Sequence, residues 1–167
     1  MNKEIQKLLS SDKIDDLNKG LSKFESKGSI KELTLVLELL NSKNAEHLEN
    51  RIVEIVGNIK VKESNSTIID AILKAKKEKG KLNSLLQICW QSSLDFTQNL
   101  ELFTEIFIEG DYITALEAFT VIENIWSDYS FAETHQQLLL DNLKDNLAGM
   151  DEHKLILAKE LIVILEN

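Results

Sequence analysis

Histidine, a common metal ligand and general base, occurs three times in this chain, at His47, His135 and His153. None forms an HxH, HxxxH or HExxH pattern with another ligand, although a glutamate directly precedes both His47 and His153. Neighbouring residues on a helix point about 100° apart, so such a pair cannot hold one metal ion side by side. We therefore expect solvated imidazoles and predict no metal site.

The single cysteine, Cys89, excludes an internal disulfide and a cysteine-based zinc site. A reactive thiol needs electropositive surroundings, and the nearest basic residues in the sequence are Lys79 and Lys81. Cys89 is therefore predicted to be a small core residue. The sequence also contains neither a glycine-rich phosphate loop nor a nucleophile elbow. We predict no catalytic residue and no cofactor.

Three carboxylates, Glu101, Glu105 and Glu109, recur at every fourth position and so lie on one face of a predicted helix. Like charges at this spacing repel one another and destabilise an isolated helix. Such an acidic stripe indicates either a solvated face or a docking surface for lysine and arginine on a partner. Adventitious binding of a divalent cation is a further reading.

Charge is divided unevenly along the chain, whose net charge is −9. Residues 1–81 hold 16 basic and 13 acidic side chains, a net of +3, whereas residues 82–167 hold 3 basic and 15 acidic ones, a net of −12. The acidic half either keeps the helices soluble or attracts a basic partner. Arg51 is the only arginine, and the lysines at 74–81 gather around one helix end, so no nucleic-acid partner is expected.

The elements that would position these side chains are helices, because the chain has no proline, only six glycines, and apolar residues at helical spacing. We predict an all-α fold with a capping box at Ser29 and Glu32. A cap at Asn65 or Ser66 is expected for a helix that turns Ile69, Ile72 and Leu73 inward. The predicted helices lie near 3–9, 12–27, after Ser29, 45–60, 67–79, 82–92, 97–109, 111–126, 134–148 and 151–166.

An internal period becomes visible when the chain is aligned with itself. The segments 55–59, 88–92 and 121–125 share an apolar pattern and begin 33 residues apart, twice in succession. Each is predicted to end a helix. This repeat period is close to the length of the two-helix unit in several helical-repeat families. Ile69, Leu102 and Leu138 mark equivalent positions in the helices that follow. Because one pair of helices cannot bury its apolar face alone, stacked pairs are expected to bury it together.

The segment from Arg51 to Ile59, RIVEIVGNI, resembles the end of the second helix in a HEAT repeat, and the resemblance extends from about Ser29 to Asn167. It implies a right-handed α-α superhelix, a HEAT-like solenoid of about ten antiparallel helices. Residues 1–167 would form a single helical-repeat domain, with an N-terminal helical cap at 1–28 and about four helix pairs at 29–167. A second resemblance is to the tetratricopeptide repeat, carried by GDYITALEAF at 110–119.

In a HEAT-like unit the second helices line the concave surface, so the resemblance assigns partner binding to residues on those helices. An ion pair with Glu54 or Glu123 is the alternative for Arg51, and core packing between repeats is the alternative for both tryptophans. The candidate partner-binding residues are Arg51, Glu54, Gln87, Trp90, Gln91, Glu117, Glu123 and Trp126.

These observations together predict a non-catalytic protein-interaction or scaffold module that binds a protein or peptide, preferably a basic one. No apolar run approaches the ~18 residues of a membrane span, so no membrane partner is expected, and a cytoplasmic location is predicted. Two alternatives remain: an enzyme, or a subunit of one, with a carboxylate-lined groove, and a self-assembling structural protein. The oligomeric state stays open.

Overall fold

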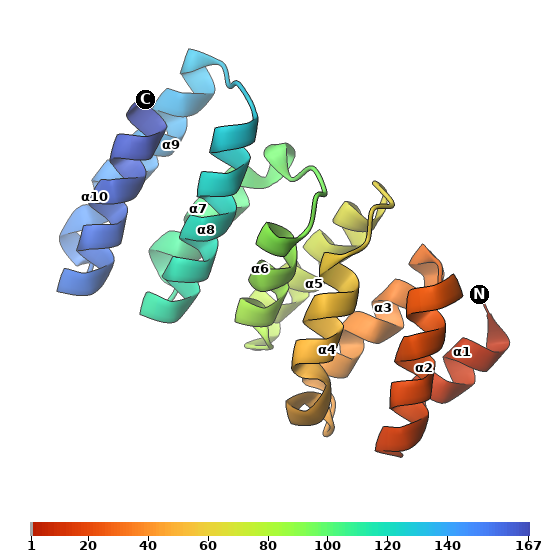
Figure 1. Cartoon of the computed structure of the whole chain (residues 1–167). Coiled ribbons are helices and arrows are strands. Elements are labelled where there is room, and N and C mark those ends of the chain that lie inside the picture. Colours follow the sequence, from red (N-terminus) through yellow and green to blue (C-terminus); the bar gives the residue numbers. More distant parts are fainter. Residues whose placement is uncertain (1) are drawn as a thin grey trace. The chain divides into compact units, whose positions relative to one another are not determined.

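The computed structural model describes residues 2–167, apart from the side chain of Ala45, and this part of the chain is all-helical with no strand (Figure 1). Ten α-helices were predicted, and the described part of the chain contains ten. They are α1 (Lys3–Leu9), α2 (Ile14–Lys27), α3 (Ile30–Glu38), α4 (Ala45–Gly57), α5 (Ser64–Glu78), α6 (Leu82–Gln91), α7 (Leu100–Glu109), α8 (Tyr112–Asp128), α9 (Glu133–Asn146) and α10 (Glu152–Glu166). Short 3-10 turns follow α3 and α9 and precede α7: η1 (Leu39–Asn41), η3 (Leu147–Gly149) and η2 (Thr97–Asn99).

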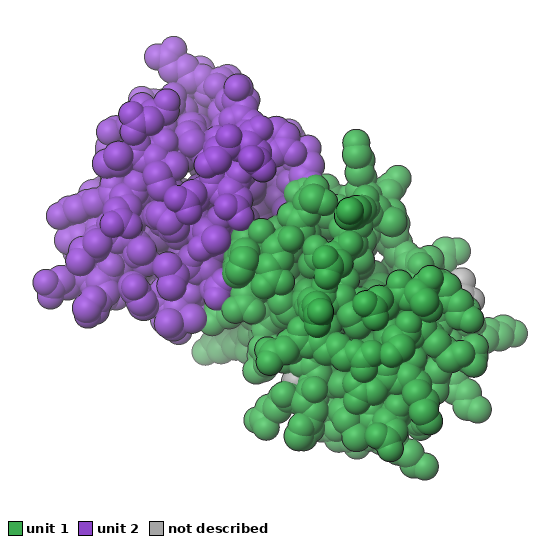
Figure 2. All heavy atoms as spheres, in the orientation of Figure 1, with its two compact units in different colours: residues 1–94 green, residues 95–167 purple. Residues whose placement is uncertain are grey.

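The chain divides into two compact units, residues 1–94 and residues 95–167, coloured green and purple in Figure 2. Unit 1 contains α1 to α6, and unit 2 contains α7 to α10. The boundary falls at the end of a stretch without charged residues, from Leu82 to Leu94. The uneven charge of the sequence is therefore a difference between the units, with a net of +3 in unit 1 and −12 in unit 2.

Each unit is built from two layers of helices. In unit 1, α1 packs on α3 and α3 on α5, while α2 packs on α4 and α4 on α6. The pairs α1–α2, α3–α4 and α5–α6 join the two layers (Figure 1). Unit 2 has the same plan, because α7 packs on α9 and α8 on α10, with α7–α8 and α9–α10 as the cross-layer pairs.

Apolar residues at helical spacing fill the space between the layers. In α2 the buried face is formed by Leu17, Leu21 and Phe24, and Gly20 lies on the same face. A β-carbon at Gly20 would lie 2.9 Å from Leu9 Cδ2, so a side chain there would force Leu9 on α1 to shift. In unit 2, Phe96 and Phe103 are buried edge to face, with ring centroids 6.1 Å apart.

Three expectations from the sequence are wrong in detail. Helix α5 begins at Ser64, before the predicted caps, and buries Ile68, Ile72 and Ala75, so Leu73 is 48% exposed. Leu138 is likewise exposed on α9. In both helices the residue next to an inward-facing one is rotated about 100° off the buried face. Helix α8 continues to Asp128, so the segment 121–125 does not end its helix.

The predicted capping box at the start of α3 is confirmed, and it extends to the N-terminus of the chain. The Glu32 carboxylate accepts hydrogen bonds from the Ser29 backbone N–H (2.9 Å), from the Ser29 hydroxyl and from the Asn2 backbone N–H. Burial raises the pKa of this 1%-exposed carboxyl, and the hydrogen bonds from Ser29 and Asn2 outweigh burial, so the pKa lies below 4.5. One charged side chain thus fastens α1 to α3.

Replacing Glu32 with alanine is expected to lower the free energy of unfolding by about 2 kcal/mol at neutral pH, because three donors lose their acceptor. The folded-state pKa is lowered, so this contribution is complete above pH 4.5 and is lost as pH falls through the folded value. Urea denaturation at pH 7 and pH 3 measures both effects. Glu25→Ala, an exposed change on α2, is the control. Equal losses for the two variants at pH 7 would contradict the prediction.

A buried lysine has the corresponding role in unit 2. Lys154 on α10 is 6% exposed, and its ammonium group donates to the carbonyl oxygens of Ile108 and Gly110, the latter at 2.8 Å. Burial lowers the pKa of this amine, while Asp151 and Asp111 oppose that shift. Lys154 thus caps the C-terminal end of α7 from a helix more than forty residues further along the chain.

Lys154→Met retains most of the apolar stem but leaves two carbonyl groups without their donor. We expect a loss of about 1–3 kcal/mol in the free energy of unfolding, measured by urea denaturation with tryptophan fluorescence as the probe. Lys159→Met, on the exposed side of the same helix, is the control and should change stability by less than about 0.5 kcal/mol. A Lys154→Met protein as stable as this control would disprove the capping role.

Candidate functional site

A polar groove that contains predicted binding residues lies between α4 and α6 in unit 1 and encloses about 360 Å³. Glu54, Gln87 and Gln91, which the sequence singled out, all line it. Two pairs along it, Glu54 with Gln87 and Asn58 with Gln91, are each separated by one repeat period. The period found in the sequence therefore brings equivalent residues of α4 and α6 side by side.

The groove offers mainly side-chain amides. Asn50, Asn58, Gln87 and Gln91 each carry a carboxamide, and Glu54 carries one carboxylate. The Asn58 Nδ2 group donates to the backbone carbonyl oxygen of Glu54 at 2.9 Å. Asn50 and Asn58 were not predicted as binding residues. Asn58 aligns with Gln91 when the chain is compared with itself, so that alignment contained the signal.

Gly57 contributes space to this groove. A β-carbon at Gly57 would lie 3.3 Å from both Cβ and Oε1 of Gln91, which is closer than ordinary van der Waals contact. A side chain at residue 57 would therefore push the Gln91 side chain back by a few tenths of an ångström. In the RIVEIVGNI segment, this glycine therefore gives the Gln91 side chain additional room in the groove.

A charged contact fixes how α4 and α6 lie against each other. Glu49 on α4 accepts a hydrogen bond from the hydroxyl of Ser84, which is buried in α6, and pairs with Lys81 at 2.9 Å. The hydrogen bond from Ser84, followed by that from Lys81, lowers the pKa of Glu49. The walls of the groove are thus held together by a contact outside its lining.

Arg51 lies on the other side of α4 and is not among the residues that line the groove. Its guanidinium donates to Asn18 Oδ1 at 2.6 Å and to Ser22 Oγ at 2.5 Å, and both acceptors are on α2. Within unit 1 the partners of Arg51 are therefore neutral α2 side chains, rather than Glu54 as the ion-pair alternative expected. Asn18 precedes Arg51 by 33 residues, so this contact also follows the repeat period.

A double-mutant cycle on Arg51→Ala and Asn18→Ala is expected to give a coupling free energy of about 1 kcal/mol between the two side chains. Chemical denaturation of the wild type, both single variants and the double variant supplies the four values. A parallel cycle with Lys19→Ala, an exposed α2 neighbour, should be additive. Additivity in both cycles would show that Arg51 does not fasten α2 to α4.

The remaining predicted binding residues are on α6 and α8. Trp90 is half-buried on α6. In unit 2, Glu117 and Glu123 are half-buried on α8, and Trp126 stacks on Phe131 with ring centroids 4.5 Å apart and planes 7° apart. This stack places Trp126 in an intramolecular aromatic contact.

His135 extends that aromatic cluster and corrects one expectation. Its ring lies 5.8 Å from the ring of Phe131, and its Nε2 atom is buried without a hydrogen-bond partner in the part of the chain that the structure describes. The prediction of a solvated imidazole is wrong for this residue. Aromatic packing, which no local motif indicates, removes its Nε2 atom from water, and the residue as a whole is half-buried. His47 and His153 are exposed as expected.

Other chemistry-bearing residues occupy the predicted environments. Glu101, Glu105 and Glu109 are all exposed on α7, and Cys89 is buried, which raises the pKa of its thiol. Within residues 2–167, apart from Ala45, no group of three or more His, Cys, Asp or Glu side chains could hold a metal ion. None of the described helices is long and apolar enough to cross a membrane.

Comparison with known proteins gave no match to a protein-family model, to a curated protein or to a solved structure.

Proposed function

We propose that this protein is a non-catalytic interaction module that binds an extended segment of a partner protein in the groove between α4 and α6. The observation that carries the proposal is the gathering of four carboxamides and Glu54 along one groove in unit 1. An extended peptide exposes alternating backbone N–H and C=O groups, which need donors and acceptors in alternation. Carboxamides supply both from one side chain.

A basic partner segment is favoured by charge. Glu54 is exposed and is the single carboxylate among the residues that line the groove. Unit 2 adds a net charge of −12, with Glu101, Glu105 and Glu109 exposed on one helix. Exposed attraction of this kind raises the association rate and is screened over about 8–10 Å at physiological salt. Binding should therefore weaken as ionic strength rises.

The repeat assignment forms part of the same proposal. Contacts that follow the repeat period, together with two helix layers in each unit, support a HEAT-like α-α superhelix of stacked pairs. In that arrangement α2, α4 and α6 would be second helices, and the groove would lie on the concave surface. The alternative of an enzyme has less support, because acid–base catalysis normally uses a second group and the groove lining contains one carboxylate.

Charge reversal in the groove tests the proposal. Tagged wild type, Glu54→Lys and Glu101→Lys/Glu105→Lys proteins would be incubated with lysate of the native host at low and high salt, and bound proteins quantified by mass spectrometry. We expect partners with basic segments, reduced severalfold by Glu54→Lys and by high salt. Each charge reversal should remove about 1 kcal/mol of attraction.

The matched control is Glu25→Lys, a charge reversal at an exposed α2 position outside the groove. It should recover the same partners as the wild type. If wild type, Glu54→Lys and Glu25→Lys recover every partner equally at both salt concentrations, the groove is not the binding site. Circular dichroism of each variant verifies that the helices are intact.

A further inference from the structure

Unit 2 exposes several large apolar side chains near the starts of two of its helices. Tyr112, Ile113 and Leu116 on α8 and Ile156 on α10 are each between 38% and 53% exposed. Apolar residues that are exposed singly are ordinary, whereas a contiguous group of them marks an interaction surface. The question is therefore whether these four side chains lie together.

Two contacts bring the starts of α8 and α10 together. The two helices pack side by side in the same layer (Figure 1). The ring of Tyr112 meets the ring of His153 edge-on, with centroids 5.9 Å apart. The ammonium group of Lys154 donates at 2.8 Å to the carbonyl oxygen of Gly110, which comes two residues before α8. The first turns of α8 and α10 are therefore neighbours.

The exposed apolar residues form a continuous patch across these neighbouring turns. Residues three or four positions apart on a helix lie side by side. Leu116 therefore adjoins both Tyr112 and Ile113 on α8, and His153 adjoins Ile156 on α10. The ring contact between Tyr112 and His153 joins the two groups. These five side chains, Tyr112, Ile113, Leu116, His153 and Ile156, are called the unit 2 patch below.

The repeat architecture does not require apolar residues at these positions. Two repeat periods before Ile113 and Leu116, the equivalent positions of α4 carry His47 and Asn50, which are polar and exposed. A helix in the same layer thus forms without an exposed apolar start. The apolar character of the patch is therefore a property of unit 2 that its packing does not explain.

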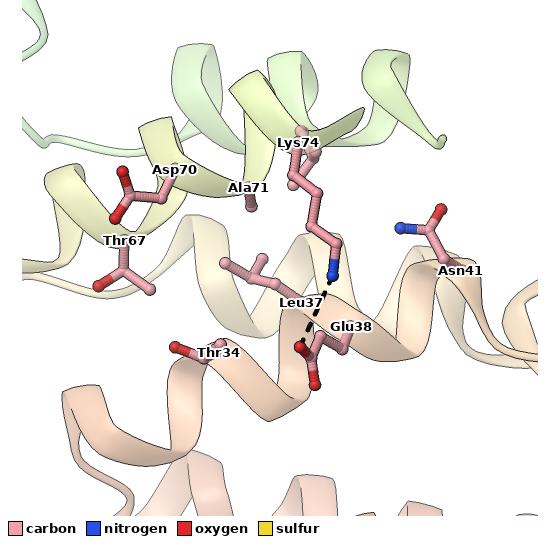
Figure 3. Close-up of a pocket in the computed structure, with 9 residues that line it drawn as sticks. Thr34, Leu37, Glu38, Asn41, Thr67, Asp70, Ala71 and Lys74 are labelled. Atoms are coloured by element: carbon pink, nitrogen blue, oxygen red, sulfur yellow. Dashed lines mark ion pairs between the residues drawn. The ribbon is translucent and has the colours of Figure 1, made fainter. Parts of the chain in front are cut away.

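Polar rims are also found in the other layer of unit 1. The groove between α3 and α5 encloses about 190 Å³. Thr34 and Thr67, one repeat period apart, lie on its opposite walls, and Lys74 crosses it to Glu38 at 3.9 Å (Figure 3). An ion pair within the chain thus spans that groove, whereas apolar side chains remain exposed at the unit 2 patch.

The surroundings of the patch are acidic. Glu117 lies one turn beyond Ile113 on α8, and Glu160 lies one turn beyond Ile156 on α10. Residues 111–128 and 151–166, which comprise both helices and their N-caps, contain eight acidic and two basic side chains, a net of −6. One of the two basic side chains, Lys154, is buried. A molecule that covers the patch therefore needs an apolar face with positive charge beside it.

This combination of charge and apolar area discriminates between possible occupants. A second copy docked through the same face would bring like charges together, and an anionic membrane would be repelled. A basic amphipathic helix instead presents apolar residues at spacings of three and four, with lysines beside them. We infer that the unit 2 patch docks a basic amphipathic helix of a partner protein, with the lysines of that helix toward Glu117 and Glu160.

The patch is independent of the groove between α4 and α6, because that groove lies in unit 1 and shares no residue with the patch. Glu54→Lys should therefore leave the binding of a helix to unit 2 unchanged. A failure of either proposal leaves the other standing.

Titration of the ¹⁵N-labelled full-length protein with the peptide acetyl-KLKALLKKLKALLKK-amide, followed by amide chemical shifts, tests the inference. In a helix, the leucines of this peptide lie on one face and its lysines on the other. We expect saturable shifts centred on the first turns of α8 and α10. Binding should weaken as ionic strength rises.

The double variant Leu116→Ser/Ile156→Ser should weaken binding about tenfold, the equivalent of about 1.4 kcal/mol, because both sides of the patch lose apolar contact. The matched control is Leu138→Ser, which changes a similarly exposed apolar side chain on α9 and should bind like the wild type. Glu160→Lys should weaken binding severalfold and leaves every apolar side chain in place. Circular dichroism verifies that each variant retains its helices.

Comparison ligands separate the possible occupants. The peptide acetyl-ELEALLEELEALLEE-amide keeps the apolar face with the opposite charge, and a permuted lysine peptide of the same composition has no apolar face. Weaker shifts with both would support the inference. Equal shifts with either peptide, shifts centred on α4 and α6, an equal loss of binding in Leu138→Ser, or no shifts would overturn it. Shifts at the patch caused by protein concentration alone, or by phosphatidylglycerol vesicles in place of the lysine peptide, would assign the patch to a second copy or to a membrane and would also overturn it.

Discussion

The apolar face that each helix must hide from water is the constraint on which the rest of this structure depends. A single pair of helices has too little area to bury that face within itself, so within each unit a helix packs against the one that comes two helices later. In unit 1 this packing joins residues one repeat period apart. The Arg51–Asn18 contact and both grooves are consequences of that one register.

Charged side chains hold helices against one another in a chain that lacks proline. Glu32 holds the first residues against α3, Glu49 connects α4 to α6, and Lys154 caps α7 from α10. Each reaches across elements and satisfies backbone or hydroxyl groups that would otherwise lose hydrogen bonds on burial. These contacts between helices are therefore made by side chains that come from another element, whereas a proline would restrict only the backbone of its own segment.

Helical content, the number of helices and the repeat period could be predicted because they depend on local apolar spacing. The buried face of α5 could not, since Ile68, Ile69, Ile72 and Leu73 present two neighbouring apolar faces and only contact with α3 and α6 selects one. Within the groove between α4 and α6, Glu54, Gln87 and Gln91 were named from the resemblance to HEAT repeats, which places them on equivalent helices. The partners of Arg51 and Lys154 depend on tertiary contacts that no short motif encodes.

The position of Lys154 has a consequence for the order in which the chain is completed during synthesis. Ile108 and Gly110 leave the ribosome more than forty residues before the side chain that caps them. Until α10 emerges, water must solvate the end of α7. Helix α10 is therefore the element that completes the C-terminal end of α7, and a nascent chain without α10 leaves those carbonyl groups without their lysine donor.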